Sequence, residues 1–91
     1  MLISPPTTNF QWIGNILSYI LDPNVTGLQI KYKKDGVTDW IVVFDNENSA
    51  PSSCPLPSTL GPTGEVMGLT RKATDHTWGP PGIEEITNQI L

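Results

Sequence analysis

The sequence predicts a small α+β domain, and three observations support this. The pair Asp35-Gly36 lies between two alternating apolar runs, which is the strongest local signal for a β-hairpin. Apolar residues in the segment 9–21 recur at the three- and four-residue spacing of an amphipathic helix. The chain of 91 residues has no internal repeat and is long enough for one core only. We therefore expect a single domain over residues 1–91, in the order helix, hairpin, strand, helix.

The segment 9–21 is the predicted N-terminal helix. Thr8 and Gln11 have the spacing of a capping box, and Asp22-Pro23 ends the pattern because proline disfavours helical geometry in the residue before it. The segment contains no charged residue, and its apolar side chains would cover more than half of the helix circumference. Such a helix is buried on more than one side, which in a small domain indicates contact with a second subunit. The residues that extend the apolar surface beyond the main stripe are Trp12, Tyr19 and Leu21.

The central hairpin is predicted over residues 27–45. A two-residue turn at Asp35-Gly36 would place Tyr32 opposite Asp39 and Ile30 opposite Ile41. One face of this hairpin is largely apolar and is the expected core side. The other face is half aromatic, and such a face is usually covered by another element or by a partner. Its apolar residues are Trp40, Val42 and Phe44.

Two segments lack a regular period. Residues 1–7 are expected to form an extended arm, because Ser4-Pro5-Pro6 blocks a helix. Residues 45–64 are rich in proline and serine and are expected to form one long loop. Loops of this length in a small domain are usually functional or mobile, so this one could contact a partner.

The C-terminal third of the chain is predicted to add a strand and a helix. Residues 65–74 alternate with the period of a β-strand and are the predicted third strand. Residues 83–91 are predicted to form a short helix, with Ile83, Ile86 and Ile90 on its inner side. Two glutamates fall in its first turn, where the helix dipole favours acidic residues.

The charge balance narrows the functional classes. A net charge of −4 and a pI near 4.6 argue against a nucleic-acid binder, because such proteins neutralise phosphates with cations. No apolar run approaches the length of a membrane span, and the first residues lack the basic region of a secretory signal. The single cysteine, Cys54, cannot form an internal disulfide. We therefore expect a cytoplasmic protein, or one of the host cytoplasm or the virion if its source is a virus.

The leading functional hypothesis is a non-catalytic, homo-oligomeric interaction module. Its size and composition suit a virus-encoded accessory protein that packs on or inhibits a larger protein assembly. The uncharged helix and the two-sided hairpin offer more apolar surface than one small core can hide. Trp40 is the expected anchor, because aromatic residues commonly dominate the binding energy of an interface. The expected interface residues are Trp12, Tyr19, Trp40, Val42 and Phe44.

The alternative hypothesis is a small-ligand binder that sequesters an anionic, nucleotide-like molecule. All five basic residues lie on two predicted strands, which would leave an electropositive spot in an acidic surround. Arg71 could hold a phosphate with both arms of its guanidinium group, and a base could stack on Trp40 or Trp78. Equally, the lysines could protect a sheet edge, with Arg71 bound to an acidic neighbour. The expected ligand residues are Lys31, Arg71, Lys72, His76 and Trp78.

No enzymatic activity is expected. The only histidine, His76, would have to activate Cys54 or a serine, and Cys54 lies in a predicted loop without a feature that lowers a thiol pKa. One histidine and one cysteine cannot form a zinc site. Residues 45–49 lack the glycine and the closing glutamate of a calcium loop. Neither a cofactor nor a metal is therefore expected.

Overall fold

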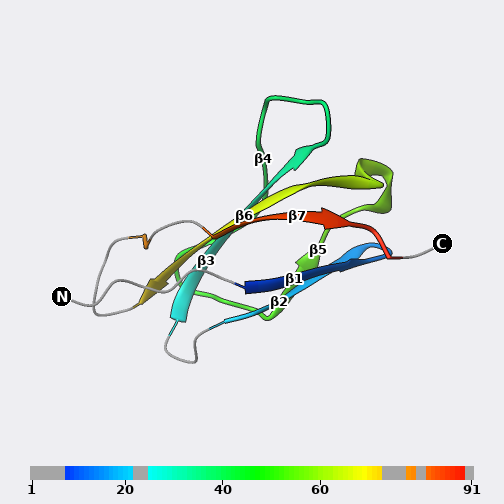
Figure 1. Cartoon of the computed structure of the whole chain (residues 1–91). Coiled ribbons are helices and arrows are strands. Elements are labelled where there is room, and N and C mark those ends of the chain that lie inside the picture. Colours follow the sequence, from blue (N-terminus) through cyan, green and yellow to red (C-terminus); the bar gives the residue numbers. More distant parts are fainter. Residues whose placement is uncertain (1–7, 22–24, 73–77, 80–81, 90–91) are drawn as a thin grey trace.

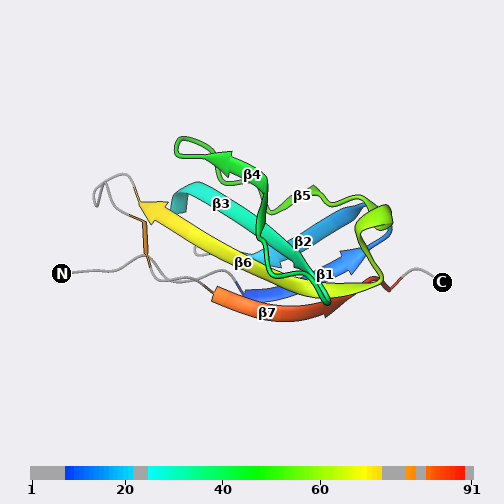
Figure 2. The same ribbon diagram turned by 90° about the horizontal axis from the view of Figure 1, so that it is seen from above.

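A computed structural model describes residues 8–21, 25–72, 78–79 and 82–89, which form a two-layered β-sandwich (Figure 1). Within these residues, seven strands make two antiparallel sheets, and the two layers are seen from above in Figure 2. The smaller sheet has the order β1-β2-β5, with β1 (Thr8–Ile13), β2 (Ile16–Ile20) and β5 (Ser53–Pro55). The larger sheet has the order β4-β3-β6-β7, with β3 (Val25–Lys34), β4 (Ile41–Asn46), β6 (Thr63–Lys72) and β7 (Gly82–Thr87).

The expected N-terminal helix is a β-hairpin, so the α+β prediction is wrong and the fold is nearly all β. Strands β1 and β2 are joined by the two-residue turn Gly14-Asn15, across which Ile13 pairs with Ile16. Gly14 has a φ of 62°, which suits the first central position of the turns that match strand twist. In a helix interior this glycine would instead be destabilising. The apolar residues then alternate between the two faces of the sheet rather than forming one helical stripe.

The predicted C-terminal helix is also replaced by a strand. Strand β7 lies antiparallel to β6, with Ile86 opposite Gly64 and Thr87 opposite Thr63. Ile86 points into the core, whereas Ile83 is exposed on the outer face of the sheet. The segment is too short to be stable as an isolated helix, and pairing with β6 satisfies its main-chain groups instead. Residues 90–91 of the predicted helix lie outside the described residues.

The central hairpin is present but has a different register from the predicted one. The turn at Asp35-Gly36 forms, since the Val37 amide donates to the Lys34 carbonyl at 3.0 Å. Strand β4 begins only at Ile41, however, which pairs with Tyr32 in place of the expected Asp39. A bulge between the pairs Ile30–Phe44 and Lys31–Val42 then leaves one extra residue, Val43, in β4. A third strand, predicted over residues 65–74, is present as β6 (Thr63–Lys72), which pairs with β3 along its length; residues 73–74 lie outside the described residues.

The segment 45–64 contributes to the core. It contains β5 and a short 3-10 helix at Ser58–Leu60, and it buries the side chains of Cys54 and Leu56. The Leu56 amide donates to the Asn15 carbonyl at 2.8 Å, which attaches the segment to the first hairpin. None of the helices in the described part of the chain is long and apolar enough to cross a membrane. The expected N-terminal arm, residues 1–7, lies outside the described residues.

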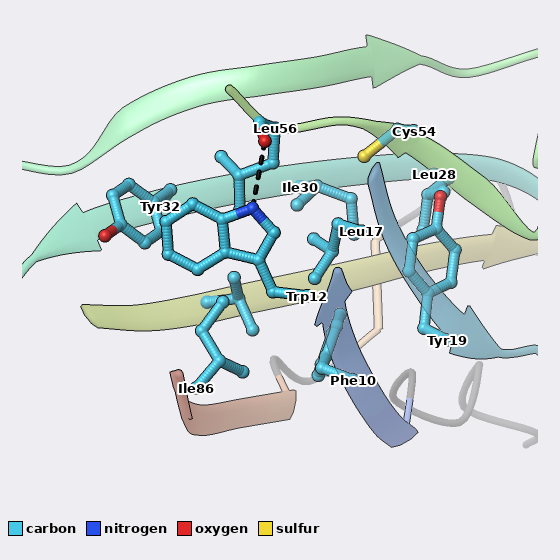
Figure 3. Packing of buried hydrophobic residues seen from close by; sticks show 11 residues of the cluster. Phe10, Trp12, Leu17, Tyr19, Leu28, Ile30, Tyr32, Cys54, Leu56 and Ile86 are labelled. Atoms are coloured by element: carbon cyan, nitrogen blue, oxygen red, sulfur yellow. Dashed lines mark hydrogen bonds between the residues drawn. The ribbon is translucent and has the colours of Figure 1, made fainter. Parts of the chain in front are cut away.

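The core lies between the two sheets and is centred on Trp12 (Figure 3). The indole of Trp12 packs edge-on against the Tyr32 ring, with 5.4 Å between the two ring centroids, and this contact joins the smaller sheet to the larger one. Its Nε1–H donates to the Leu56 carbonyl at 2.9 Å, so the buried polar atom of the indole is satisfied. The buried residues of this core are Phe10, Trp12, Leu17, Tyr19, Leu28, Ile30, Tyr32, Cys54, Leu56, Val66 and Ile86.

Candidate functional site

The charged residues of the described chain all belong to the larger sheet and its connecting loops. Strands β1 and β2 contain no Asp, Glu, Lys or Arg, and neither does the segment 48–62, which includes β5. One layer of the sandwich is therefore electrically neutral, whereas the other carries all of the described charge. Exposed sheet faces are normally polar, so the outer surface of the neutral layer is the candidate site.

The outward side chains of the smaller sheet form a continuous uncharged surface, called the neutral face below. Three isoleucines dominate it, with exposed fractions of 47% for Ile13, 51% for Ile16 and 58% for Ile20. Strand alternation sends Trp12, Leu17 and Tyr19 inward and leaves these residues outside. The neutral face consists of Gln11, Ile13, Ile16, Ser18, Ile20, Ser53 and Pro55.

The outer surface of the larger sheet also exposes apolar side chains, such as Val42 and Ile83, but they lie among charged ones. Lys33 Nζ lies 3.0 Å from Glu65 Oε1 and 5.2 Å from the centre of the Trp40 ring. Glu85 lies opposite Glu65 on the neighbouring strand. Charges of both signs, partly paired and partly exposed, are typical of a surface that faces water. The contrast between the two layers makes the neutral face the surface that gains most from being covered.

The five expected interface residues do not form one surface in this fold. Trp12 is fully buried and Tyr19 is nearly so, and both point between the sheets, where a partner cannot reach them. Trp40 is half-buried beside Lys33, and Phe44 packs partly against the core. Val42 is 56% exposed, but it lies on β4 in the charged layer. Of the expected segments, β1 and β2 still present an apolar outer side, formed by other residues.

The residues missed in the sequence are Ile13, Ile16 and Ile20. In a helix they belong to the inner stripe, whereas in two strands they point outward. The available signal was Gly14-Asn15, a two-residue pair of the kind that closes hairpins, with apolar alternation on both sides. Identifying that turn first would have reversed the assignment of inner and outer faces.

The residues proposed for an anionic ligand are only partly brought together. Arg71 pairs with Trp78 through a main-chain bridge, and its Nη1 lies 2.7 Å from Glu47 Oε2. Lys31 lies on the outer face of β3, opposite Val42 and Met67. The main chain of Lys72 pairs with Val25, but its side chain is not described. His76 lies outside the described residues.

The chemistry of Cys54 is that of a buried, protonated thiol. The side chain is buried in the core, and this burial raises the pKa of the thiol. Burial also raises the pKa of the neighbouring Tyr19, and the Cys54 sulfur raises it further. A thiol with a raised pKa forms little thiolate and is a weak nucleophile. Among the described residues, no cluster of three His, Cys, Asp or Glu side chains could hold a metal ion.

Comparisons with known proteins identify no relative of this chain. No family model, no curated protein and no solved structure matches it. The features that bear on function are therefore the neutral face and the distribution of charge between the two layers.

Proposed function

We propose that this protein is a non-catalytic interaction module that works as a homo-oligomer through its neutral face. The observation that carries the proposal is the exposure of Ile13, Ile16 and Ile20 on a sheet face without a charged residue. Covering a large aliphatic side chain contributes about 1.5–3 kcal/mol when it becomes fully buried. Three half-exposed isoleucines therefore supply a substantial driving force. The face itself carries no charge to desolvate, and the Glu84 carboxylate at its β1 edge already accepts from the Phe10 amide at 3.1 Å.

A second copy of the chain is the partner that the electrostatics favour. Two copies that each carry a net charge of −4 repel one another. The repulsion is weakest when the copies meet through surfaces that contain no ionisable side chain. The neutral face is also complementary to a second copy of itself, because it carries no charge that would need an opposite charge on the partner. A nucleic acid, by contrast, would find no cation on this face with which to bind its phosphates.

The wider role proposed for the module is that of a virus-encoded accessory protein that packs on or inhibits a larger assembly. The small size and the acidic composition support this role. The free thiol of Cys54 suits a reducing compartment, so we place the module in the cytoplasm, or in the virion if it is viral. The ligand-binding alternative loses support, because Arg71 Nη1 already lies 2.7 Å from the carboxylate of Glu47.

The proposal is tested by a lysine substitution on each layer. Ile16 is 51% exposed on the neutral face, and Ile83 is 50% exposed on the outer face of the larger sheet, so the two substitutions disturb the folded monomer to a similar degree. Ile16→Lys should dissociate the oligomer, because the charge must be desolvated at the contact. Ile83→Lys should leave it intact. Sedimentation velocity gives the mass, and circular dichroism shows that both variants are folded.

Two outcomes would overturn the proposal. An oligomer that survives Ile16→Lys would show that the neutral face is not the contact. An oligomer that dissociates with Ile83→Lys but not with Ile16→Lys would place the contact on the charged layer.

A further inference from the structure

The arrangement of side chains on the neutral face indicates how two copies would meet. We infer that the faces pack against each other about a two-fold axis that runs along β2, so that each β2 residue lies over its own counterpart. This inference rests on the proposed function and adds the geometry of the contact. It follows from the strand register, which sorts the neutral face into rows that cross the three strands.

The rows differ in polarity. Ile13 pairs with Ile16, and Ile16 pairs with Pro55, which makes one row wholly apolar. The next row is polar but uncharged, since Ser18 pairs with Gln11 on one side and with Ser53 on the other. Ile20 follows two residues further along β2, where it pairs with Thr8, and begins a third row. From the turn end of the hairpin to its open end, the face therefore has an apolar row, a polar row and a third row of mixed residue types, Ile20 and Thr8.

An axis along β2 superposes each row on the same row of the second copy. It exchanges β1 with β5 across the interface, so that Ile13 of one copy faces Pro55 of the other. The apolar row then meets another apolar row, and Ser18 lies opposite Ser18, where the two hydroxyl groups can bond to each other. An axis perpendicular to the strands would instead place the apolar row over the row of Ile20 and would bring fewer apolar side chains together.

Pairing of free sheet edges is the competing way to join two copies. Strand β4 is an edge strand of the larger sheet, so its outer main-chain groups could in principle accept another strand. The bulge at Val43 interrupts the regular spacing of these groups, and bulges of this kind oppose edge-to-edge pairing. Strand β5 spans three residues and ends in Pro55, which cannot donate a main-chain hydrogen bond. The other two edge strands, β1 and β7, meet each other through the Trp12–Asn88 bridge. The four edges therefore favour contact through a face.

The two possible axes predict different distances. Packed sheets lie about 10 Å apart, so an axis along β2 places the two Ile16 Cα atoms about 10 Å from each other. An axis perpendicular to the strands through Ser18 shifts them by about 13.6 Å along the strands, which gives a separation of roughly 17 Å. Ser18 lies on the axis in both cases. Cross-linking through single cysteines can therefore separate the two arrangements.

The experiment uses the full chain with Ile16→Cys, Ile20→Cys or Ser18→Cys and a bis-maleimide linker too short to span 17 Å. We expect Ile16→Cys to cross-link to itself, and a mixture of differently tagged Ile16→Cys and Ile20→Cys chains to form no mixed product. Ser18→Cys should cross-link to itself whenever the neutral faces meet. Wild type is the background control because Cys54 is buried, and Ile83→Cys is the control for a random exposed thiol.

Each failure has its own meaning. Mixed Ile16–Ile20 products without Ile16 self-products would overturn the axis along β2 while keeping the neutral face as the contact. A dimer in which Ser18→Cys does not cross-link, or in which Ile83→Cys does, would overturn face-to-face packing. If Ile16→Cys or Ile20→Cys sediments as a monomer while wild type is a dimer, Gln11→Cys and Ser53→Cys replace them, because Gln11 faces Ser53 of the second copy across an axis along β2 and faces its own counterpart across the perpendicular axis. Wild type that sediments only as a monomer would remove the proposed function itself.

Discussion

The side-chain amide of Asn88 binds both main-chain groups of Gly14. Its oxygen accepts from the Gly14 amide at 3.0 Å, and its nitrogen donates to the Gly14 carbonyl at 2.9 Å. The next residue, Gln89, donates its amide to the Trp12 carbonyl at 2.8 Å. The end of β7 thus closes the sandwich against β1 and holds the turn that positions Ile13 and Ile16 on the neutral face (Figure 1).

Removal of this contact should destabilise the whole fold. We expect Asn88→Ala to lower the free energy of unfolding by about 1–3 kcal/mol, because Gly14 is buried and loses two hydrogen bonds. Asn88→Asp should lose a comparable amount at neutral pH, since a carboxylate oxygen replaces the nitrogen that donates to the Gly14 carbonyl. Urea denaturation measures both values. If both variants were as stable as wild type, the closure would contribute nothing in solution.

The two buried tyrosines should respond oppositely to loss of the hydroxyl group. Tyr32 donates to the Leu60 carbonyl at 2.6 Å, so Tyr32→Phe should lower the free energy of unfolding by about 1–2 kcal/mol. The Tyr19 hydroxyl is buried, and its polar neighbour among the described residues is the Cys54 thiol, which is only a weak hydrogen-bond partner. Tyr19→Phe should therefore be neutral or stabilising. Thermal unfolding of the pair provides the check, and a larger loss from Tyr19→Phe than from Tyr32→Phe would contradict it.

The free energy of unfolding should fall as the pH becomes alkaline. Burial raises the pKa of Cys54 and of Tyr19, so the folded chain keeps these protons at pH values where the unfolded chain loses them. The folded state then binds more protons, and the free energy of unfolding falls as pH rises above about 9. Below that range these groups leave stability unchanged. Denaturation of wild type at pH 7 and pH 10 should show the decline.

The control for the alkaline decline is Cys54→Ala. Removal of the thiol should make the decline shallower without abolishing it, because Tyr19 remains. Wild type should also react slowly with a thiol reagent at pH 7 and quickly once unfolded, since the folded chain buries the sulfur. Equal slopes for both proteins, or fast labelling of folded wild type, would place Cys54 at the surface.

The parts of the fold that could be predicted are those with a single strong local signal. Asp35-Gly36 indicated a turn, and the alternation after residue 65 indicated β6. The first hairpin was missed because its apolar residues satisfy two periods at once. Phe10, Leu17 and their neighbours fit the helical spacing, whereas the pairs across Gly14-Asn15 fit a hairpin. Only the long-range bonds of the turn to Leu56 and Asn88 decide between them.

The segment that carries the candidate site was singled out in the sequence, but the residues that form the site were not. The absence of charge in the segment 9–21 was interpreted as a helix that contacts a second subunit; the helix is wrong, and the contact with a second subunit stays a prediction. In the hairpin that forms instead, apolar side chains lie on both sides. Which residues form that side depends on the secondary structure. A helix would have placed Trp12 outside, whereas the strand buries Trp12 and exposes Ile13. The lack of charge in the composition thus pointed to the segment, whereas the two-residue repeat of a β-strand determines which of its residues face outward.

Sedimentation equilibrium of wild type at low and high salt tests the central claim most directly. The claim is that two copies meet through a face without charge. We expect a species of twice 10.0 kDa at micromolar concentration, with an affinity that is unchanged or increased in 1 M salt, because screening weakens the repulsion between two acidic chains. A 10.0 kDa species at every concentration, or a dimer that dissociates as salt is added, would contradict the claim.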